Sequence, residues 1–314
     1  MTTIKDLARI SGLSIGTISR YLNGYEVKEK TKIAIERAIE QTGYIRNPIA
    51  RSMKTGKSMT VAVVVPNLAN MFSMRVIESV EHVLEKEGYS VIVSDCGGDA
   101  QKQLEKLETL KYRMVDGFVL MPLTHSADAV AAALGGIPLV LIDRLLDKPA
   151  FDSVTVSNFE AAYRETARML SGGLRKIGII EGPDDIYTAT ERKRGFEQAV
   201  SEFGAENIHR TCGGYNISDG YTAMQKLLKH DLEGVFISNY ELTVGAMQAY
   251  AESGAAPDML VTVGFDSVEI SKLVNKSMAC ISQPIEQIGE VAARLLLARM
   301  REPDKPIENV IIKI

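Results

Sequence analysis

From residue 60 onward, short apolar runs typical of β-strands alternate with amphipathic segments typical of helices. Near-continuous apolar strands separated by helices are typical of a parallel sheet that is covered on both faces. The nine runs that we predict as strands are residues 60–65, 90–94, 117–121, 138–142, 153–156, 176–180, 234–238, 260–264 and 278–282. Nine strands exceed one small sheet, so the pattern predicts two doubly wound parallel α/β sub-domains, with the chain crossing between them near residues 157–159 and 283–285.

The composition is that of a globular protein rather than a fibrous, disordered or disulfide-stapled chain. The 314 residues are 46% hydrophobic and 24% charged, enough for about two domains with a buried core. Cys96, Cys212 and Cys280 are too scattered for a disulfide framework, and no metal-ligand spacing joins them to the histidines. The chain begins without an apolar signal stretch, and its most apolar region, residues 129–142, is broken by Gly and Pro. We expect a protein of the reducing cytoplasm that uses no cofactor.

The first 45 residues contain short helical patterns and no strand-like run. The patterns predict helices over residues 4–8, 15–22 and about 31–42. Thr3 and Ser14 are suitable caps for the first two helices. The small Ala8, the turn residue Gly12 and the apolar Ile18 have the spacing of a helix-turn-helix. We therefore predict an all-α head over residues 1–46, a connecting segment over 47–58 and an α/β body over 59–314.

Charge separates the head from the rest of the chain. Residues 1–60 hold 11 Lys and Arg against 5 Asp and Glu, a net charge of +6, whereas the remainder carries −10. Such asymmetry is typical of a polyanion-binding module on an acidic carrier, although a solvated basic face is also common. Outward positions of the second helix are small or polar, and Arg20 can donate two hydrogen bonds to one guanine. Phosphates would be neutralised by Lys5, Lys28, Lys30 and Lys32. A helical hairpin without a ligand is the alternative.

Two patterns that suggest an enzyme fail on their context. Residues 12–16 fit the G-x-S-x-G expression of serine hydrolases, but that motif follows a strand, and here a helix is expected before it. Residues 55–58 are similar to a phosphate-binding loop, but the glycine required five residues before Gly56 is Arg51. We therefore expect no enzyme.

Three stretches, residues 3–8, 14–23 and 43–53, resemble the lactose/galactose repressor (LacI/GalR) family, and the resemblance extends over essentially the whole chain. It implies a dimeric bacterial transcription regulator whose head reads a roughly palindromic operator. It also implies that residues 47–58 are a hinge helix and linker. Residues 59–314 would then be an effector-binding and dimerisation domain similar to periplasmic sugar-binding proteins. In this family the linker folds into a hinge helix on DNA and inserts a side chain into the minor groove.

The same resemblance assigns residues to the DNA. Ile15, Gly16 and Arg20 take base-reading positions, although Gly16 has no side chain with which to select a base. Ala50 is expected between paired hinge helices, and Met53, where the family usually has leucine, is expected as the minor-groove wedge. Positions at or near the DNA backbone are Thr17, Ser19, Asn23 and Tyr44. The full set expected at DNA is Ile4, Lys5, Ser14, Ile15, Gly16, Thr17, Ser19, Arg20, Asn23, Tyr44, Asn47, Ala50, Arg51 and Met53.

A small ligand is expected in a cleft between the two α/β sub-domains, at the carboxyl ends of the strands. Ser73 and Asp266 lie in loops that follow predicted strands. By resemblance, the effector positions are Phe72, Asp143, Asn158, Arg192, Tyr215, Asn239 and Tyr240. For Asp143, Asn158 and Asp266, capping alone is an equally good explanation. Tyr240 stands where the family commonly has Asp, so a phosphorylated or anionic sugar, a nucleoside and other polar metabolites all stay open as effectors.

The leading hypothesis is a cytoplasmic, nucleoid-associated transcriptional repressor that acts as a homodimer. Its expected partners are double-stranded operator DNA and a small-molecule effector such as a sugar, sugar phosphate or nucleoside, with no membrane. The effector would shift the relative angle of the sub-domains and hence the operator affinity. A solute-binding receptor, which needs an export signal, and an enzyme on a doubly wound fold are the alternatives. The sequence does not distinguish an inducer from a corepressor.

Overall fold

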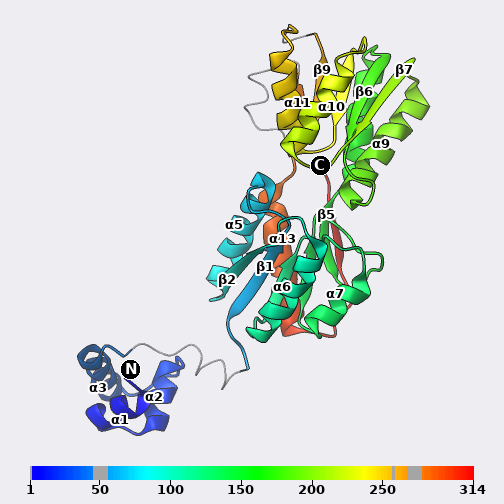
Figure 1. The fold of residues 1–314 in the computed structure, drawn as a ribbon. Coiled ribbons are helices and arrows are strands. Elements are labelled where there is room, and N and C mark those ends of the chain that lie inside the picture. Colours follow the sequence, from blue (N-terminus) through cyan, green and yellow to red (C-terminus); the bar gives the residue numbers. More distant parts are fainter. Residues whose placement is uncertain (1, 45–55, 257–258, 267–277) are drawn as a thin grey trace. The chain divides into compact units, whose positions relative to one another are not determined.

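The computed structural model describes residues 2–44, 56–256, 259–266 and 278–314, and the chain divides into two units, Met1–Ser58 and Met59–Ile314. Each unit has a hydrophobic core of its own. Figure 1 shows the helical N-terminal unit and the α/β second unit. The predicted hinge residues Asn47, Ala50, Arg51 and Met53 lie outside the described residues.

The described residues of the first unit form a bundle of three helices. They are α1 (Ile4–Ser11), α2 (Ile15–Leu22) and α3 (Glu29–Thr42). Leu7, Ile18, Ile35 and Ala38 are fully buried and hold one residue or more from each helix in a common core. All three predicted helices are confirmed, with α1 ending three residues later and α3 beginning two residues earlier than the sequence pattern indicated.

The second unit begins with a six-stranded parallel sheet. Its strands are β1 (Thr60–Val65), β2 (Ser90–Asp95), β3 (Gly117–Leu120), β4 (Leu139–Ile142), β5 (Asp152–Val156) and β11 (Asn309–Ile312), in the order β11-β5-β4-β3-β1-β2. One face packs on α5 (Met71–Lys86) and α13 (Ile285–Arg301), and the other on α6 (Ala100–Tyr112) and α7 (Ala127–Leu134). The sheet is therefore doubly wound.

A second parallel sheet has five strands in the order β10-β9-β8-β6-β7. They are β6 (Lys176–Glu181), β7 (Asn207–Cys212), β8 (Gly234–Ile237), β9 (Val261–Phe265) and β10 (Met278–Ile281). One face packs on α8 (Asn158–Ser171) and α9 (Tyr187–Phe203), and the other on α10 (Ile217–Leu227) and α11 (Tyr240–Glu252). The predicted fold class, a helical head with two doubly wound sheets, is confirmed.

The two sheets repeat one strand order, because β5-β4-β3-β1-β2 in the first corresponds to β10-β9-β8-β6-β7 in the second. The chain leaves the first sheet after β5 and returns after β10, and β11 then pairs with β5. A loop in one sheet therefore has a counterpart in the other, and the loops at the carboxyl ends of β4 and β9 are one such pair.

Two strands were missed by the sequence analysis, and both lie at a sheet edge. β7 carries His209 and Arg210 in its middle, and β11 leaves Ile311 62% exposed. His209 and Arg210 interrupt the apolar pattern of β7, and the apolar run of β11 is only residues 310–312. The other two edge strands, β2 and β10, have longer runs and were predicted.

Candidate functional site

Local interactions set the geometry of the helix-turn-helix. At the start of α1, Thr3 Oγ1 accepts a hydrogen bond from the Asp6 N–H at 3.4 Å, and Asp6 Oδ2 accepts one from the Thr3 N–H at 3.0 Å. Gly12 has φ of +68°, in the left-handed region that favours glycine, and ends the helix. At the start of α2, Ser14 Oγ accepts from the Thr17 N–H at 3.1 Å. The two predicted caps and the predicted turn are confirmed.

The predicted DNA-contacting residues of the head differ in exposure. The exposed residues are Lys5, Ser14, Ile15, Gly16, Arg20 and Asn23, and Thr17 and Ser19 are partly exposed. Ile15 presents an apolar side chain, 45% exposed, at the first turn of α2. Ile4 and Tyr44, in contrast, pack against the core of the head. The N-terminal half of α2 is thus the part of the head whose small and polar side chains are open to a partner.

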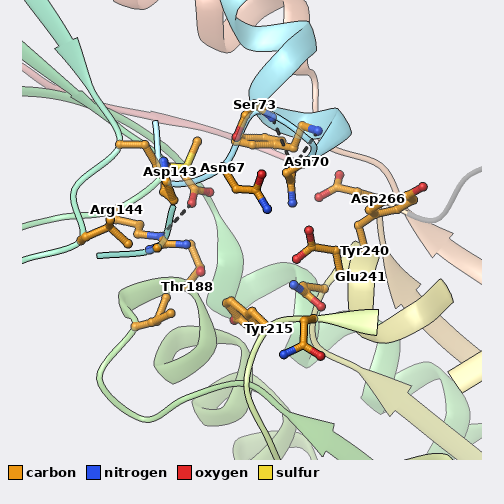
Figure 2. Close-up of a pocket in the computed structure, with 18 of the residues that line it drawn as sticks. Asn67, Asn70, Ser73, Asp143, Arg144, Thr188, Tyr215, Tyr240, Glu241 and Asp266 are labelled. Carbon is orange, nitrogen blue, oxygen red and sulfur yellow. Dashed lines mark hydrogen bonds and ion pairs between the residues drawn. The ribbon is translucent and has the colours of Figure 1, made fainter. Parts of the chain in front are cut away.

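The second unit contains a cavity of about 440 Å³, which we call the central cavity. Its lining includes residues that follow β1, β2, β3 and β4 of the first sheet and β6, β7, β8, β9 and β10 of the second. Figure 2 shows polar side chains from both sub-domains directed into it. The cavity therefore lies at the carboxyl ends of the strands, where ligands bind in doubly wound folds.

Arg192, in α9, is a buried cation of the central cavity, with only 3% of its surface exposed. Its Nε donates to Asn158 Oδ1 at 2.8 Å and its Nη1 donates to the Ser238 carbonyl at 2.6 Å. The guanidinium carbon lies 3.7 Å from the centroid of the Phe265 ring, a cation–π contact. A charge that is held by two hydrogen bonds and a ring is oriented before any ligand arrives.

Two carboxyl groups occupy equivalent positions of the repeated fold. Asp143 follows β4 with φ of +66°, and Asp266 follows β9 with φ of +51°. Positive φ is strained for residues other than glycine, and such strain concentrates at functional sites. Burial raises the pKa of both carboxyl groups, and the charge of Arg192 opposes the rise. Burial therefore makes the ionised form of each carboxyl group less favourable than it is in water.

Two further residues complete the lining near these carboxyl groups. Gln283 donates its backbone N–H to Asp266 Oδ1 at 3.2 Å and its Nε2 to Oδ2 at 2.5 Å, while its own Oε1 is buried without a partner in the described residues. The Tyr215 ring lies against Gly182, where an added Cβ would fall 2.0 Å from Tyr215 Cε1. Only a glycine leaves room for the ring, so Gly182 sets the place of this aromatic wall.

Most of the residues predicted for effector binding meet in the central cavity. They are Phe72, Ser73, Asp143, Arg192, Tyr215, Asn239, Tyr240 and Asp266. Asn158 is not part of the lining. It is 1% exposed and lies behind Arg192, whose Nε it binds, so it positions the guanidinium instead of facing the cavity.

Sequence analysis missed several polar residues of the lining. They are Asn67, Asn70, Arg144, Thr188, Asn216, Glu241 and Gln283. Asn70, Asn216 and Asn239 share one signal, since each is the N-cap of a helix that begins at the cavity. An Asn before an amphipathic segment predicts a cap. In a doubly wound fold, a cap that follows a strand also lies at the ligand end of the sheet.

A helix-turn-helix head on a two-sheet body with a polar central cavity defines a regulator that binds DNA and responds to a small molecule. Residues 3–47 match the bacterial regulatory proteins of the lacI family, and residues 61–303 match the periplasmic binding protein domain. The chain belongs to the lacI family, and it is a DNA-binding transcriptional regulator of that family. The resemblance inferred from the sequence is confirmed.

The chain is similar along most of its length to proteins with known roles. The ribose operon repressor of Halalkalibacterium halodurans is 30% identical over 98% of this chain and 93% of that protein. A LacI family regulator from Enterococcus faecium, solved with bound ribose, is 26% identical, with a TM-score of 0.73 over 81% of this chain and 95% of that one. The lac repressor dimer bound to operator has a TM-score of 0.89 over 99% of this chain and 96% of that one, at 22% identity, and thus supports the fold alone.

No helix in the described part of the chain has both the length and the apolar character that a membrane crossing requires. Among the same residues, no group of three or more His, Cys, Asp or Glu side chains is arranged to hold a metal ion.

Proposed function

We propose that the protein is a ligand-controlled repressor that binds a palindromic operator as a homodimer and takes its effector in the central cavity. The observation that carries this proposal is the buried guanidinium of Arg192, held by Asn158, Ser238 and Phe265 against a polar cavity of about 440 Å³. A buried charge is costly, and one oriented toward a cavity is best explained by a ligand.

The head supplies the operator contact. Ile15, Gly16 and Arg20 lie exposed on α2, which begins at a capped N-terminus, and short side chains there permit close approach to the major groove. Arg20 reads a base, and Lys5 and the α3 lysines Lys30 and Lys32 neutralise phosphates. Asn47, Ala50, Arg51 and Met53 remain predicted contacts of a hinge segment. A homodimer presents two heads, so the operator has two-fold symmetry.

The effector is a small polar molecule with a ring or a compact carbon skeleton. Phe72, Tyr215 and Tyr240 offer aromatic faces, and Arg192 and Asp266 offer polar groups at the edge of the same cavity. The names of two relatives, a ribose operon repressor and a ribose-bound regulator, support a sugar or a related polyol. A nucleoside has the same combination of a ring and hydroxyl groups.

Control arises because the central cavity is shared by two sub-domains. An effector that contacts both sheets favours one relative arrangement of them, and a change in that arrangement alters the spacing of the paired hinges. The protein has no enzymatic role in this scheme and acts on the nucleoid in the cytoplasm. The acidic body, with a net charge of −10 beyond residue 60, leaves DNA contact to the head.

Selection of bound sequences from a random duplex library at about 0.15 M salt tests this function. We expect enrichment of a two-fold symmetric site that binds one dimer, with an affinity about 10³-fold or more above that for unrelated duplex. The absence of any enriched site, with and without candidate sugars and nucleosides, would contradict the proposal. Enrichment of an asymmetric site that binds a single chain would contradict the dimer.

A further inference from the structure

The central cavity has an unbalanced charge. Three carboxyl groups line it, those of Asp143, Asp266 and Glu241, against the guanidinium groups of Arg144 and Arg192. Arg144 Nε lies 3.5 Å from Asp143 Oδ2. The charge of Arg192 acts on both Asp143 and Asp266, where it opposes the rise in pKa that burial causes. The carboxyl groups of the lining thus outnumber the guanidinium groups by one, and we assign the excess to Glu241.

Helix N-termini normally make a cavity of this kind attractive to anions, because their free N–H groups point into it. Here the caps of three helices that begin at the cavity use their own oxygen for those groups. Asn70 Oδ1 accepts from the N–H groups of Phe72 and Ser73, at 2.9 and 3.3 Å. Asn239 Oδ1 accepts from Leu242 at 2.8 Å, and Asn216 Oδ1 accepts from Asp219 at 3.0 Å. At each of these termini the protein itself thus satisfies one or two of the free N–H groups.

Glu241 adds a negative charge at one of the same termini. It is in the first turn of α11, in the second sub-domain, and shares a hydrogen bond with Asn70 of the first sub-domain. Burial raises the pKa of Glu241, and the hydrogen bond from Asn70 and the charge of Arg144 oppose the rise. Figure 2 shows Asn70 and Glu241 entering the pocket from different parts of the fold. The carboxyl group thus adds a negative charge at the α11 terminus, which disfavours an anionic ligand there.

The hydrogen-bonding groups that remain also favour one class of ligand. Three residues of the lining each have a buried polar atom without a hydrogen-bond partner in the described residues: Gln283 Oε1, Arg144 Nε and the Tyr215 hydroxyl. Gln283 Oε1 and the three carboxyl groups are acceptors, which need donors from the ligand, whereas Arg144 Nε and the Tyr215 hydroxyl can donate to it. A hydroxyl group both donates and accepts and so suits all of these groups, whereas an ionised phosphate only accepts.

We propose that Glu241 selects an uncharged, hydroxyl-bearing effector and rejects its phosphorylated form. This inference rests on the proposed function, since it concerns the effector of the same cavity. Glu241 acts as a specificity-determining residue in two ways. Its charge repels a phosphate at the short distances within the cavity, and its oxygen accepts from a hydroxyl group.

Matched pairs of ligands test the proposal by titration calorimetry on the full chain. The pairs are D-ribose and ribose 5-phosphate, D-glucose and glucose 6-phosphate, D-fructose and fructose 6-phosphate, and adenosine and its 5′-monophosphate. We expect the uncharged member of at least one pair to bind, and its phosphorylated partner to bind about 100-fold more weakly or worse. Glu241→Gln keeps an acceptor oxygen but removes the charge, and we expect it to reduce that ratio about tenfold by strengthening the phosphorylated member.

Glu252→Gln is the matched control, because Glu252 ends the same helix, binds the Tyr221 hydroxyl at 2.6 Å and does not line the cavity. It should keep the wild-type ratio. Tighter binding of a phosphorylated member to the wild-type protein would overturn the proposal, and α9, which begins at the cavity without a side-chain cap, is where that phosphate could lie. A ratio unchanged by Glu241→Gln would also overturn it. If no member of any pair binds, the proposed effector class is wrong, and operator binding by the same sample then shows whether the DNA-binding function stands.

Discussion

At the scale of single residues, Arg20 carries the sequence specificity that we assign to the head. It is exposed in the last turn of α2, and one guanidinium can donate two hydrogen bonds to a guanine. Arg20→Ala should lower discrimination between operator and unrelated duplex by about 1–3 kcal/mol. Lys30→Ala, on α3, should weaken binding to both duplexes equally, because a phosphate contact carries no base information. Fluorescence anisotropy measures the affinity of both variants for the two duplexes. If the ratio of operator affinity to unrelated-duplex affinity is unchanged in Arg20→Ala, Arg20 does not read a base.

The burial of Asp266 leads to a prediction about the thermal stability of the ligand-free protein. Burial raises the pKa of Asp266 above its unfolded value, so the folded state binds more protons and stability falls as pH rises through that interval. Asp266→Asn removes the buried charge, and its new N–H can donate to the unpartnered Oε1 of Gln283 after that amide rotates. The variant should therefore have a higher Tm than wild type at pH 7 and lose this advantage as the pH approaches 4.

The matched control for Asp266→Asn is Asp231→Asn. Lys176 lowers the pKa of the exposed Asp231, so this substitution removes a favourable charge and should not raise the Tm at pH 7. Thermal unfolding across the pH range gives both results. An Asp266→Asn variant that is less stable than wild type at pH 7 would show that the charge of Asp266 stabilises the fold and is not a cost borne for a ligand.

At the scale of elements, the start of α2 depends on one cap. Ser14 Oγ accepts from the Thr17 N–H at 3.1 Å, and loss of such a cap costs about 1 kcal/mol. In the full chain without DNA, Ser14→Ala should speed hydrogen exchange of the α2 amides about fivefold, whereas Ser14→Asn, which keeps a capping oxygen, should leave it near wild type. Equal exchange in wild type and Ser14→Ala would show that tertiary packing alone holds the helix.

Strands with a long apolar run were predictable from sequence, and two edge strands with a short or interrupted run were not. The inner strands of both sheets appear as apolar runs because helices cover them on each side, as at β3 and β8. The edge strands β7 and β11 carry exposed residues and were missed. The residues of the candidate site were also predicted only in part. Arg192 and Tyr215 were found by resemblance, whereas Asn158 faces Arg192 and not the cavity. Glu241 was missed because a carboxylate in the first turn of a helix has an ordinary explanation in the helix dipole.

At the scale of the whole molecule, the chain joins a DNA-reading unit to a sensing unit, and the account requires that the two be energetically coupled. Coupling between two binding sites is reciprocal, so an effector that changes operator affinity by a given factor must have its own affinity changed by the same factor when operator is bound. Coupling in regulators of this kind is typically about 1–3 kcal/mol, or about 5- to 150-fold.

The most direct measurement is therefore a double titration on one sample, with operator affinity measured with and without effector, and effector affinity with and without operator. We predict two equal factors of about fivefold or more. Arg192→Ala, checked for a cooperative thermal transition, should bind operator as wild type does, yet no longer respond to the effector. Operator binding that is unaffected by a ligand shown to occupy the central cavity would contradict the account.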